Sequence, residues 1–250
     1  MNNRIVIIIG ALAAVGAAIG VYLYLGSGVH RHSQAESLYR ESLSALDRGN
    51  AFEAEAKVQK AIDLAPDEPR FHAAKGEALA VEGDYARAKT SFAKAADLDP
   101  ADHKSRYEAG RMAVKEGKSD EAVKHFEKAV SAEPANLQAL YQLGVQYCLH
   151  RHLDDAQKIY EQIISVAPNE VEAHRGLGWV LTQKRDYVQA EVNYRKAIEL
   201  KPDYAEAVND LGNLYRILGR NIDARQQFQK ALALNPNLIE AKHNLEKLNH

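Results

Sequence analysis

The sequence predicts an all-α protein: a right-handed α-solenoid of about six helix pairs plus a C-terminal capping helix, preceded by one N-terminal transmembrane helix. Two observations carry this prediction. Prolines, alanines and aromatic residues recur every 34 residues over most of the chain, and an uncharged apolar stretch lies near its start. With only 7 prolines and 15 glycines among 250 residues, the chain favours long regular elements over many short strands.

The composition argues against several classes of protein. The chain has 32 basic and 34 acidic residues, for a net charge of −2, whereas a dedicated nucleic-acid binder usually carries a basic excess. Its single cysteine excludes an intramolecular disulfide and a multi-cysteine metal cluster. A hydrophobic content of 46% with 26% charged residues is ordinary for a packed chain. We therefore expect a folded protein with no nucleic-acid partner.

The N-terminal apolar stretch runs from Ile5 to Leu25 and contains no charged residue. As a helix it would be about 31 Å long, close to the thickness of a bilayer's hydrocarbon core of about 30 Å. The alternative is a cleaved signal peptide, whose apolar region is usually about 7–15 residues long. The greater length and the lack of an A-x-A cleavage site favour an uncleaved anchor, and no nearby cysteine would carry a lipid.

The flanking charges orient this anchor only weakly, because Arg4 on one side faces Arg31 and Arg40 on the other. Since Arg4 adjoins the membrane, we expect a bacterial inner-membrane protein with its repeats on the periplasmic side. Gly16 and Gly20 form a small-xxx-small pair that would let two such helices pack closely into a homo-oligomer. Small residues are also common in apolar spans that do not associate.

The rest of the chain is divided by the 34-residue period. Prolines mark it at Pro66, Pro100, Pro134, Pro168, Pro202 and Pro236. Alanines mark it at Ala54, Ala88, Ala122, Ala156, Ala190 and Ala224. Four residues after these alanines come Val58, Phe92, Phe126, Tyr160, Tyr194 and Phe228. This pattern predicts two helices per repeat, with small residues at their contact and a proline that ends the second helix. One pair cannot bury its apolar faces alone, so neighbouring pairs must stack.

This pattern resembles the tetratricopeptide repeat (TPR) family, and the sixth repeat shows it most fully. Its residues are Leu211, Gly212, Tyr215, Gly219, Ala224, Phe228, Ala231 and Pro236. The resulting divisions are an N-terminal flank (1–4), the anchor (5–25), a linker (26–34), repeats 1 to 6 (35–68, 69–102, 103–136, 137–170, 171–204 and 205–238) and a capping helix (239–250). The resemblance implies that the first helices of the repeats line a concave, partner-binding face.

The early repeats depart from the family pattern at two of its usual apolar positions. Glu41 and Lys75 stand where the later repeats have leucine, and His72 and Arg106 replace a bulky apolar residue. We therefore expect repeats 1 to 3 to pack less tightly than repeats 4 to 6.

No P-loop, nucleophile elbow, HExxH motif or dinucleotide fingerprint occurs in the chain. Cys148, His150 and His152 alternate at a helix end and would point in different directions, which favours a small groove residue and a solvated turn over a metal site. We expect no enzyme activity, no catalytic residues, no cofactor and no metal.

The candidate site is therefore the concave groove, into which two positions of each first helix, four residues apart, should point. From these positions we predict a partner-binding groove of Tyr107, Arg111, Tyr141, Val145, Arg175, Trp179, Asn209 and Asn213. Trp179, the only tryptophan, would anchor it, because aromatic residues and arginine dominate binding hot spots. The alternative is that Trp179 is a core residue between repeats 4 and 5.

The sequence thus predicts a membrane-anchored TPR scaffold that binds a protein or peptide partner in this groove. The alternative function is a structural or assembly subunit of a larger membrane complex. Asn209 and Asn213 resemble part of the clamp with which some TPR proteins hold a chaperone's C-terminal carboxylate, but the paired lysines of that clamp are missing.

Overall fold

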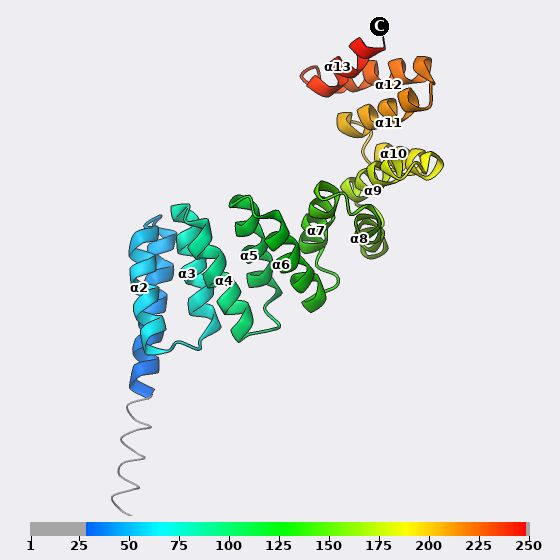
Figure 1. Cartoon of the computed structure of the whole chain (residues 1–250). Coiled ribbons are helices and arrows are strands. Elements are labelled where there is room, and N and C mark those ends of the chain that lie inside the picture. Colours follow the sequence, from blue (N-terminus) through cyan, green and yellow to red (C-terminus); the bar gives the residue numbers. More distant parts are fainter. Residues whose placement is uncertain (1–28, 249–250) are drawn as a thin grey trace, which may run out of the picture. The chain divides into compact units, whose positions relative to one another are not determined.

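The structure, a computed structural model, describes residues 29–248, and every regular element in that range is a helix (Figure 1). These residues form two compact units, which are divided between Lys118 and Ser119. We call them the N-terminal unit and the C-terminal unit.

The N-terminal unit contains a helix over residues 29–47 and four helices that follow it. These are α2 (Ala51–Leu64), α3 (Pro69–Glu82), α4 (Tyr85–Leu98) and α5 (His103–Lys115). Helices α2 to α5 pack against their neighbours in chain order. Their core includes Val58 and Phe71, both fully buried. The pairs of helices predicted from the 34-residue period are thus present in this unit.

The C-terminal unit contains the remaining helices of the described chain. They are α6 (Ser119–Ala132), α7 (Leu137–Leu149), α8 (Leu153–Val166), α9 (Val171–Gln183), α10 (Tyr187–Leu200), α11 (Ala205–Ile217), α12 (Asn221–Leu234) and α13 (Ile239–Lys247). Each packs against the next, and α11 also contacts α9 and α13. The first helices of repeats 5 and 6, α9 and α11, are therefore in contact, and α13 covers α11 where a further repeat would otherwise begin.

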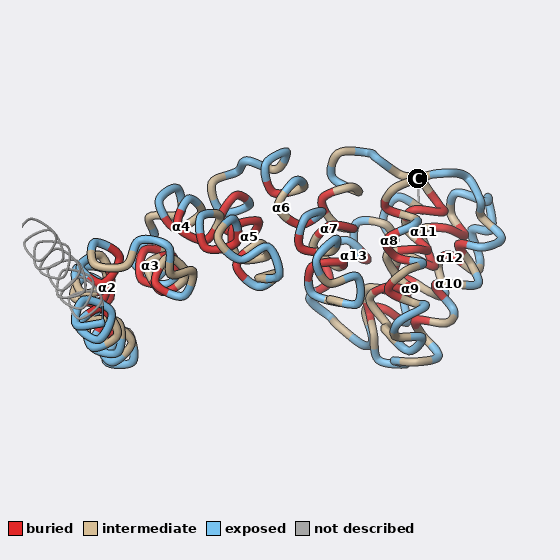
Figure 2. The backbone as a smooth tube through the Cα atoms, turned by 90° about the horizontal axis from the view of Figure 1, so that it is seen from below, coloured by how far each residue is buried: buried red, intermediate tan, exposed pale blue. Residues whose placement is uncertain are grey.

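Short polar turns delimit the helices. The side chains of Asn50, Asp84, Asp102, Asn136 and Asp186 each accept a hydrogen bond from a backbone N–H in the first turn of the following helix. Such caps satisfy donors that the helix itself leaves unpaired. Burial follows the helix–helix contacts: buried residues face neighbouring helices, and exposed residues fill the turns and outer faces (Figure 2).

Aromatic side chains pack directly on glycines, which explains why both recur with the repeat. A Cβ atom added to Gly76 would lie 2.8 Å from the ring of Phe92, and one added to Gly178 or Gly212 would meet Tyr194 or Phe228 at 2.8 and 2.7 Å. Any larger residue would push the two helices of a repeat apart. The close approach of each helix pair therefore depends on these glycines.

The structure differs from the sequence prediction at the start of the first helix. Residues 29–34, predicted as part of a linker, are already helical, because no glycine or proline interrupts the chain from there to Gly49. The polar residues expected to loosen the early repeats have hydrogen-bond partners, and the looser packing of these repeats stays a prediction. His72 donates from Nε2 to the Pro66 carbonyl at 2.7 Å, and Arg106 donates to the Ala96 carbonyl at 2.8 Å. Both bonds join a first helix to the end of the preceding repeat.

Glu41 and Lys75 are likewise paired, with Lys57 and Gln59 of α2. These contacts replace an apolar contact with a polar one at the helix surface: Glu41 forms an ion pair with Lys57, and the Lys75 ammonium donates to the neutral Gln59 side chain.

The predicted transmembrane segment, residues 5–25 with Gly16 and Gly20, lies outside the described residues. Between residues 29 and 248, no helix combines the length and the apolar character needed to cross a membrane.

Candidate functional site

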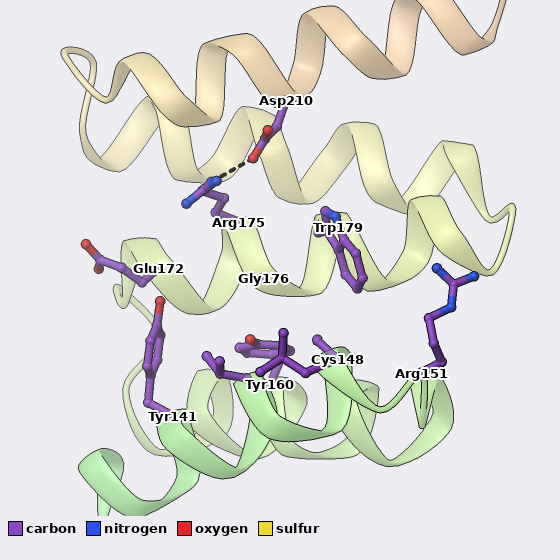
Figure 3. Close-up of a pocket in the computed structure, with 11 residues that line it drawn as sticks. Tyr141, Cys148, Arg151, Tyr160, Glu172, Arg175, Gly176, Trp179 and Asp210 are labelled. Atoms are coloured by element: carbon purple, nitrogen blue, oxygen red, sulfur yellow. Dashed lines mark hydrogen bonds and ion pairs between the residues drawn. The ribbon is translucent and has the colours of Figure 1, made fainter. Parts of the chain in front are cut away.

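A pocket of about 400 Å³ opens between helices of the C-terminal unit (Figure 3). Helix α7 and the turn after it form one side, α9 forms the other, and α8 and α11 each add one residue. The lining consists of Tyr141, Val145, Cys148, Leu149, Arg151, Tyr160, Glu172, Arg175, Gly176, Trp179 and Asp210. This volume is within the range of small-molecule and side-chain binding sites.

The floor of the pocket is the ring of Tyr160, which projects from α8 and is only 4% exposed. It lies between two glycines: an added Cβ would be 3.2 Å away from its Cζ atom at Gly144 and 2.6 Å away at Gly176. Tyr141 meets this ring edge-on, with the ring centroids 6.4 Å apart. Burial raises the pKa of Tyr160 and of Cys148, so the floor is uncharged at neutral pH.

The walls are apolar and partly open to solvent. Trp179 of α9 and Val145 of α7 are half-buried, and Leu149 at the end of α7 is 69% exposed. Trp179 thus differs from the fully buried residues of the same helix, such as Val180. Its indole lines the pocket, which favours the groove interpretation of this residue over the core alternative.

Arg175 borders the pocket but is held by its own chain. Its Nε donates to Asp210 of α11 at 2.6 Å, and its Nη1 donates to the Tyr204 hydroxyl at 3.3 Å. The guanidinium also lies 5.6 Å from the centre of the Tyr204 ring. Burial raises the pKa of Asp210, and the charge of Arg175 opposes that rise. The pair therefore joins repeats 5 and 6, which is a role that the sequence did not indicate.

The eight predicted groove residues are distributed unequally. Tyr141, Val145, Arg175 and Trp179 line the pocket together. Asn209 is only 7% exposed and accepts a hydrogen bond from Asn244 of α13 at 3.1 Å, so the capping helix covers it. Asn213 accepts from the Arg216 guanidinium at 2.8 Å and does not line the pocket.

The other two predicted groove residues lie in the N-terminal unit. The Arg111 guanidinium pairs with Glu108 at 2.9 Å and lies 5.9 Å from the centre of the Tyr107 ring. They belong to the same helix, α5, and form a local contact there.

Several lining residues were not predicted, and Gly176 is the most informative of them. The same repeat position holds Arg40, Ala74, Glu108, Gln142 and Asp210 elsewhere. A glycine inside a helix usually costs stability relative to alanine, so its presence at this position is a signal of close approach. Here it makes room for the Tyr160 ring and thereby creates the pocket floor.

No group of three or more His, Cys, Asp and Glu side chains within residues 29–248 is arranged to hold a metal ion. Cys148 lies in the pocket lining, and His150 faces Asp120, with Nδ1 3.5 Å from the carboxylate.

Gly176→Ala is expected to destabilise the protein. Helix propensity alone would stabilise it by about 1 kcal/mol, but the new Cβ would overlap the Tyr160 ring, and overpacking costs about 1–3 kcal/mol. We expect a lower free energy of unfolding by chemical denaturation. In a Tyr160→Leu background the same substitution should be neutral or stabilising, because the contacting ring is gone. Stabilisation in the otherwise unchanged chain would show that the ring does not rest on Gly176.

Arg175→Met is expected to lower the free energy of unfolding by about 1–2 kcal/mol, because it leaves the mostly buried Asp210 carboxylate without its partner. The guanidinium side chain is 36% exposed, so solvent screening keeps the effect below that of a fully buried pair. Arg185→Met is the control, since Arg185 is exposed and has no ion-pair partner among the described residues. Equal denaturation midpoints for the two variants would contradict the proposed role of the pair.

Four models of the tetratricopeptide repeat match the chain, at residues 39–103, 113–179, 172–204 and 205–238. Together they cover well over half of it. The chain therefore belongs to the tetratricopeptide repeat family, as the spacing of its prolines, alanines and aromatic residues indicated. None of the curated proteins matches it in sequence.

Solved structures share this fold. YrrB, described as a TPR protein with an unusual peptide-binding site, is 23% identical over 76% of this chain and 97% of its own, with a TM-score of 0.66. MamA from Desulfovibrio magneticus RS-1 is 28% identical over 68% of this chain and 97% of its own, with a TM-score of 0.58. The pilF protein of Pseudomonas aeruginosa is 18% identical over 87% and 99%, with a TM-score of 0.64.

Proposed function

We propose that this protein is a membrane-anchored scaffold that binds an extended segment of a protein partner in the pocket of its C-terminal unit. The observation that carries the proposal is the composition of that pocket. Trp179 and Tyr141 offer partly exposed aromatic surface above an uncharged floor, and charged groups lie at the rim. A central aromatic anchor with a polar surround is the arrangement found at interface hot spots.

The family and the similar structures support this proposal. TPR proteins are interaction modules, and YrrB is described as having a peptide-binding site. In this proposal the chain is not an enzyme and uses neither cofactor nor metal. The partner segment would bind against the first helices that border the pocket. Because these helices are already ordered, binding would require little rearrangement of the protein.

The second part of the proposal is the anchor at residues 5–25, which would hold the repeats at a bacterial inner membrane, on the periplasmic side. Its support is the sequence: the stretch is uncharged and long enough to span a bilayer. Confinement to the membrane would raise the effective concentration of the scaffold near any membrane-bound partner. Gly16 and Gly20 would lie on the face through which two anchors could associate.

The anchor predicts a definite fractionation result. Membranes washed with alkaline carbonate should retain the full chain, still beginning at Met1 or Asn2, because the apolar helix is buried in hydrocarbon rather than bound by charge. A variant lacking residues 5–25 should be released by the same wash. Soluble protein that begins near Val29 would show a cleaved signal peptide instead.

The binding function is tested by affinity purification of the full chain from native membranes, with quantitative mass spectrometry of the co-purified proteins. A partner bound in the pocket should be lost from Trp179→Ala and retained by Lys196→Ala, a substitution on α10 outside the pocket lining. A partner that is retained by both variants but lost when residues 5–25 are deleted would indicate the alternative function, a structural or assembly subunit that docks through its anchor.

A further inference from the structure

The turn between the two helices of a repeat needs a left-handed residue, and two repeats use arginine there. Four of these turns use Gly49, Gly83, Gly117 and Gly219, with φ between 73° and 82°. At the same position, repeats 4 and 5 have Arg151 and Arg185, with φ of 62° and 66°. A residue with a Cβ atom costs about 1–2 kcal/mol more than glycine in this conformation. Such an outlier is a reason to look for a functional role of the side chain.

Arg151 has such a role available, because its side chain lines the pocket (Figure 3). Its Nη1 donates to the Gln183 side-chain oxygen at 3.1 Å, which is a neutral partner. The carboxylates that follow in sequence are already paired: Asp154 with Lys184 at 2.6 Å and Asp155 with Lys158 at 3.0 Å. Within the described residues, the positive charge of Arg151 has no acidic partner.

The opposite end of the pocket carries the opposite charge. Figure 3 shows Glu172 beside Tyr141 at one end and Arg151 beyond Trp179 at the other. Glu172 has no ion-pair partner among the described residues, and the residue one turn further along its helix is Gly176, which offers no side chain. The nearby Arg175 is engaged by Asp210. The pocket is therefore apolar in the middle, with an unpaired cation at one end and an unpaired anion at the other.

We propose that this pocket selects a peptide segment with a carboxylate and a basic group on either side of a bulky apolar side chain. This inference rests on the proposed binding function and names the chemistry of its partner. The carboxylate would bind the Arg151 guanidinium, the apolar side chain would lie on Tyr160 against Trp179, and the basic group would face Glu172. Charge-assisted hydrogen bonds at both ends would add to the apolar contact.

The charges also fix the direction of the bound segment. A segment bound in the reverse direction would bring its basic group to Arg151 and its carboxylate to Glu172, and such like-charge contacts oppose binding. Apolar contact at the pocket centre would therefore give affinity, while the two ends would give direction and specificity. A left-handed arginine at this turn is then retained for recognition despite its conformational cost.

The test begins with a random heptapeptide display library selected on the full chain in mild detergent. Selected sequences should combine a bulky apolar residue with an acidic residue on one side and a basic residue on the other. The peptide that binds most tightly is then synthesised with a free and with an amidated C terminus. A variant in which its Asp or Glu is replaced by the corresponding amide is made as well. These peptides show whether the carboxylate comes from a side chain or from the peptide terminus.

Arg151→Gly and Arg185→Gly form a matched pair of protein variants. Each restores the glycine found in the other repeats, so both should melt at the same temperature as the unaltered chain or a few degrees higher. Only Arg151→Gly should weaken binding of the selected peptide, by about 2- to 5-fold for an exposed charged contact. It should also bind the acidic peptide and its amide variant equally. Glu172→Gln should likewise remove the preference for the basic group.

Three results would overturn the inference, and they separate it from the proposed function. Peptides that require Trp179 but show no charge preference, or a preference unchanged in Arg151→Gly, contradict the inference and leave the binding function intact. Equal loss in Arg151→Gly and Arg185→Gly assigns the effect to the turns rather than to recognition. A library that yields no Trp179-dependent peptide contradicts both proposals.

Discussion

Trp179→Ala is expected to weaken binding of the partner by at least about 2 kcal/mol, or about 30-fold, while the protein stays folded. The indole is partly exposed and lines the pocket, so its exposed surface is available to a partner. Removing it would take away the largest apolar contact area in the pocket. The measurement is titration of purified partner or selected peptide against the full chain and the variant, by calorimetry or fluorescence anisotropy.

Lys196→Ala on α10 is the control, because Lys196 pairs with Glu199 on its own helix at 2.8 Å and lies outside the pocket lining. It should bind normally. Thermal melts of both variants distinguish the two interpretations of Trp179. A large drop in the melting temperature of Trp179→Ala would mean that the residue is part of the core. Normal binding by a folded Trp179→Ala would mean that the partner does not use this pocket.

Tyr160→Ala is expected to lower the free energy of unfolding by about 3–5 kcal/mol, the usual cost of truncating a buried aromatic residue to alanine. The ring is 4% exposed and packs closely on Gly144 of α7 and Gly176 of α9. Its removal would leave a cavity that glycine residues cannot fill. Chemical denaturation followed by circular dichroism measures the effect.

Phe52→Ala provides the comparison for removal of an exposed aromatic residue, because Phe52 is 77% exposed. Its effect should stay within about 0.5 kcal/mol, as for most surface substitutions. Similar losses of stability in the two variants would contradict the role of Tyr160 as the support between repeats 4 and 5.

The fold could be predicted from the sequence because its determinants repeat. Helices α3, α5, α7, α9 and α11 begin at residues 69, 103, 137, 171 and 205, at 34-residue intervals. The pattern arises because the repeats share one packing problem: in repeats 2, 4, 5 and 6 a glycine admits an aromatic ring, and in every repeat a proline follows the second helix. The period could not predict that the first helix already includes residues 29–34, since no repeating contact constrains them.

The site could be predicted only in part, because its remaining features depend on single contacts. Helical spacing was enough to bring Tyr141, Val145, Arg175 and Trp179 to one surface. It could not show that Asp210 would engage Arg175 or that α13 would cover Asn209, because these partners lie about 35 residues away in sequence. Nor could periodicity single out Gly176 and Arg151, since both are exceptions to the repeat.

The most direct test of the account is photo-crosslinking from the pocket in native membranes. A photoreactive phenylalanine analogue in place of Trp179 in the full chain should form a crosslinked product with the partner upon illumination, and competing peptide should suppress that product. The same analogue in place of Lys196 should give no such product. Crosslinking from position 196 but not from position 179, with both proteins folded, would contradict the claim that the partner is bound in this pocket.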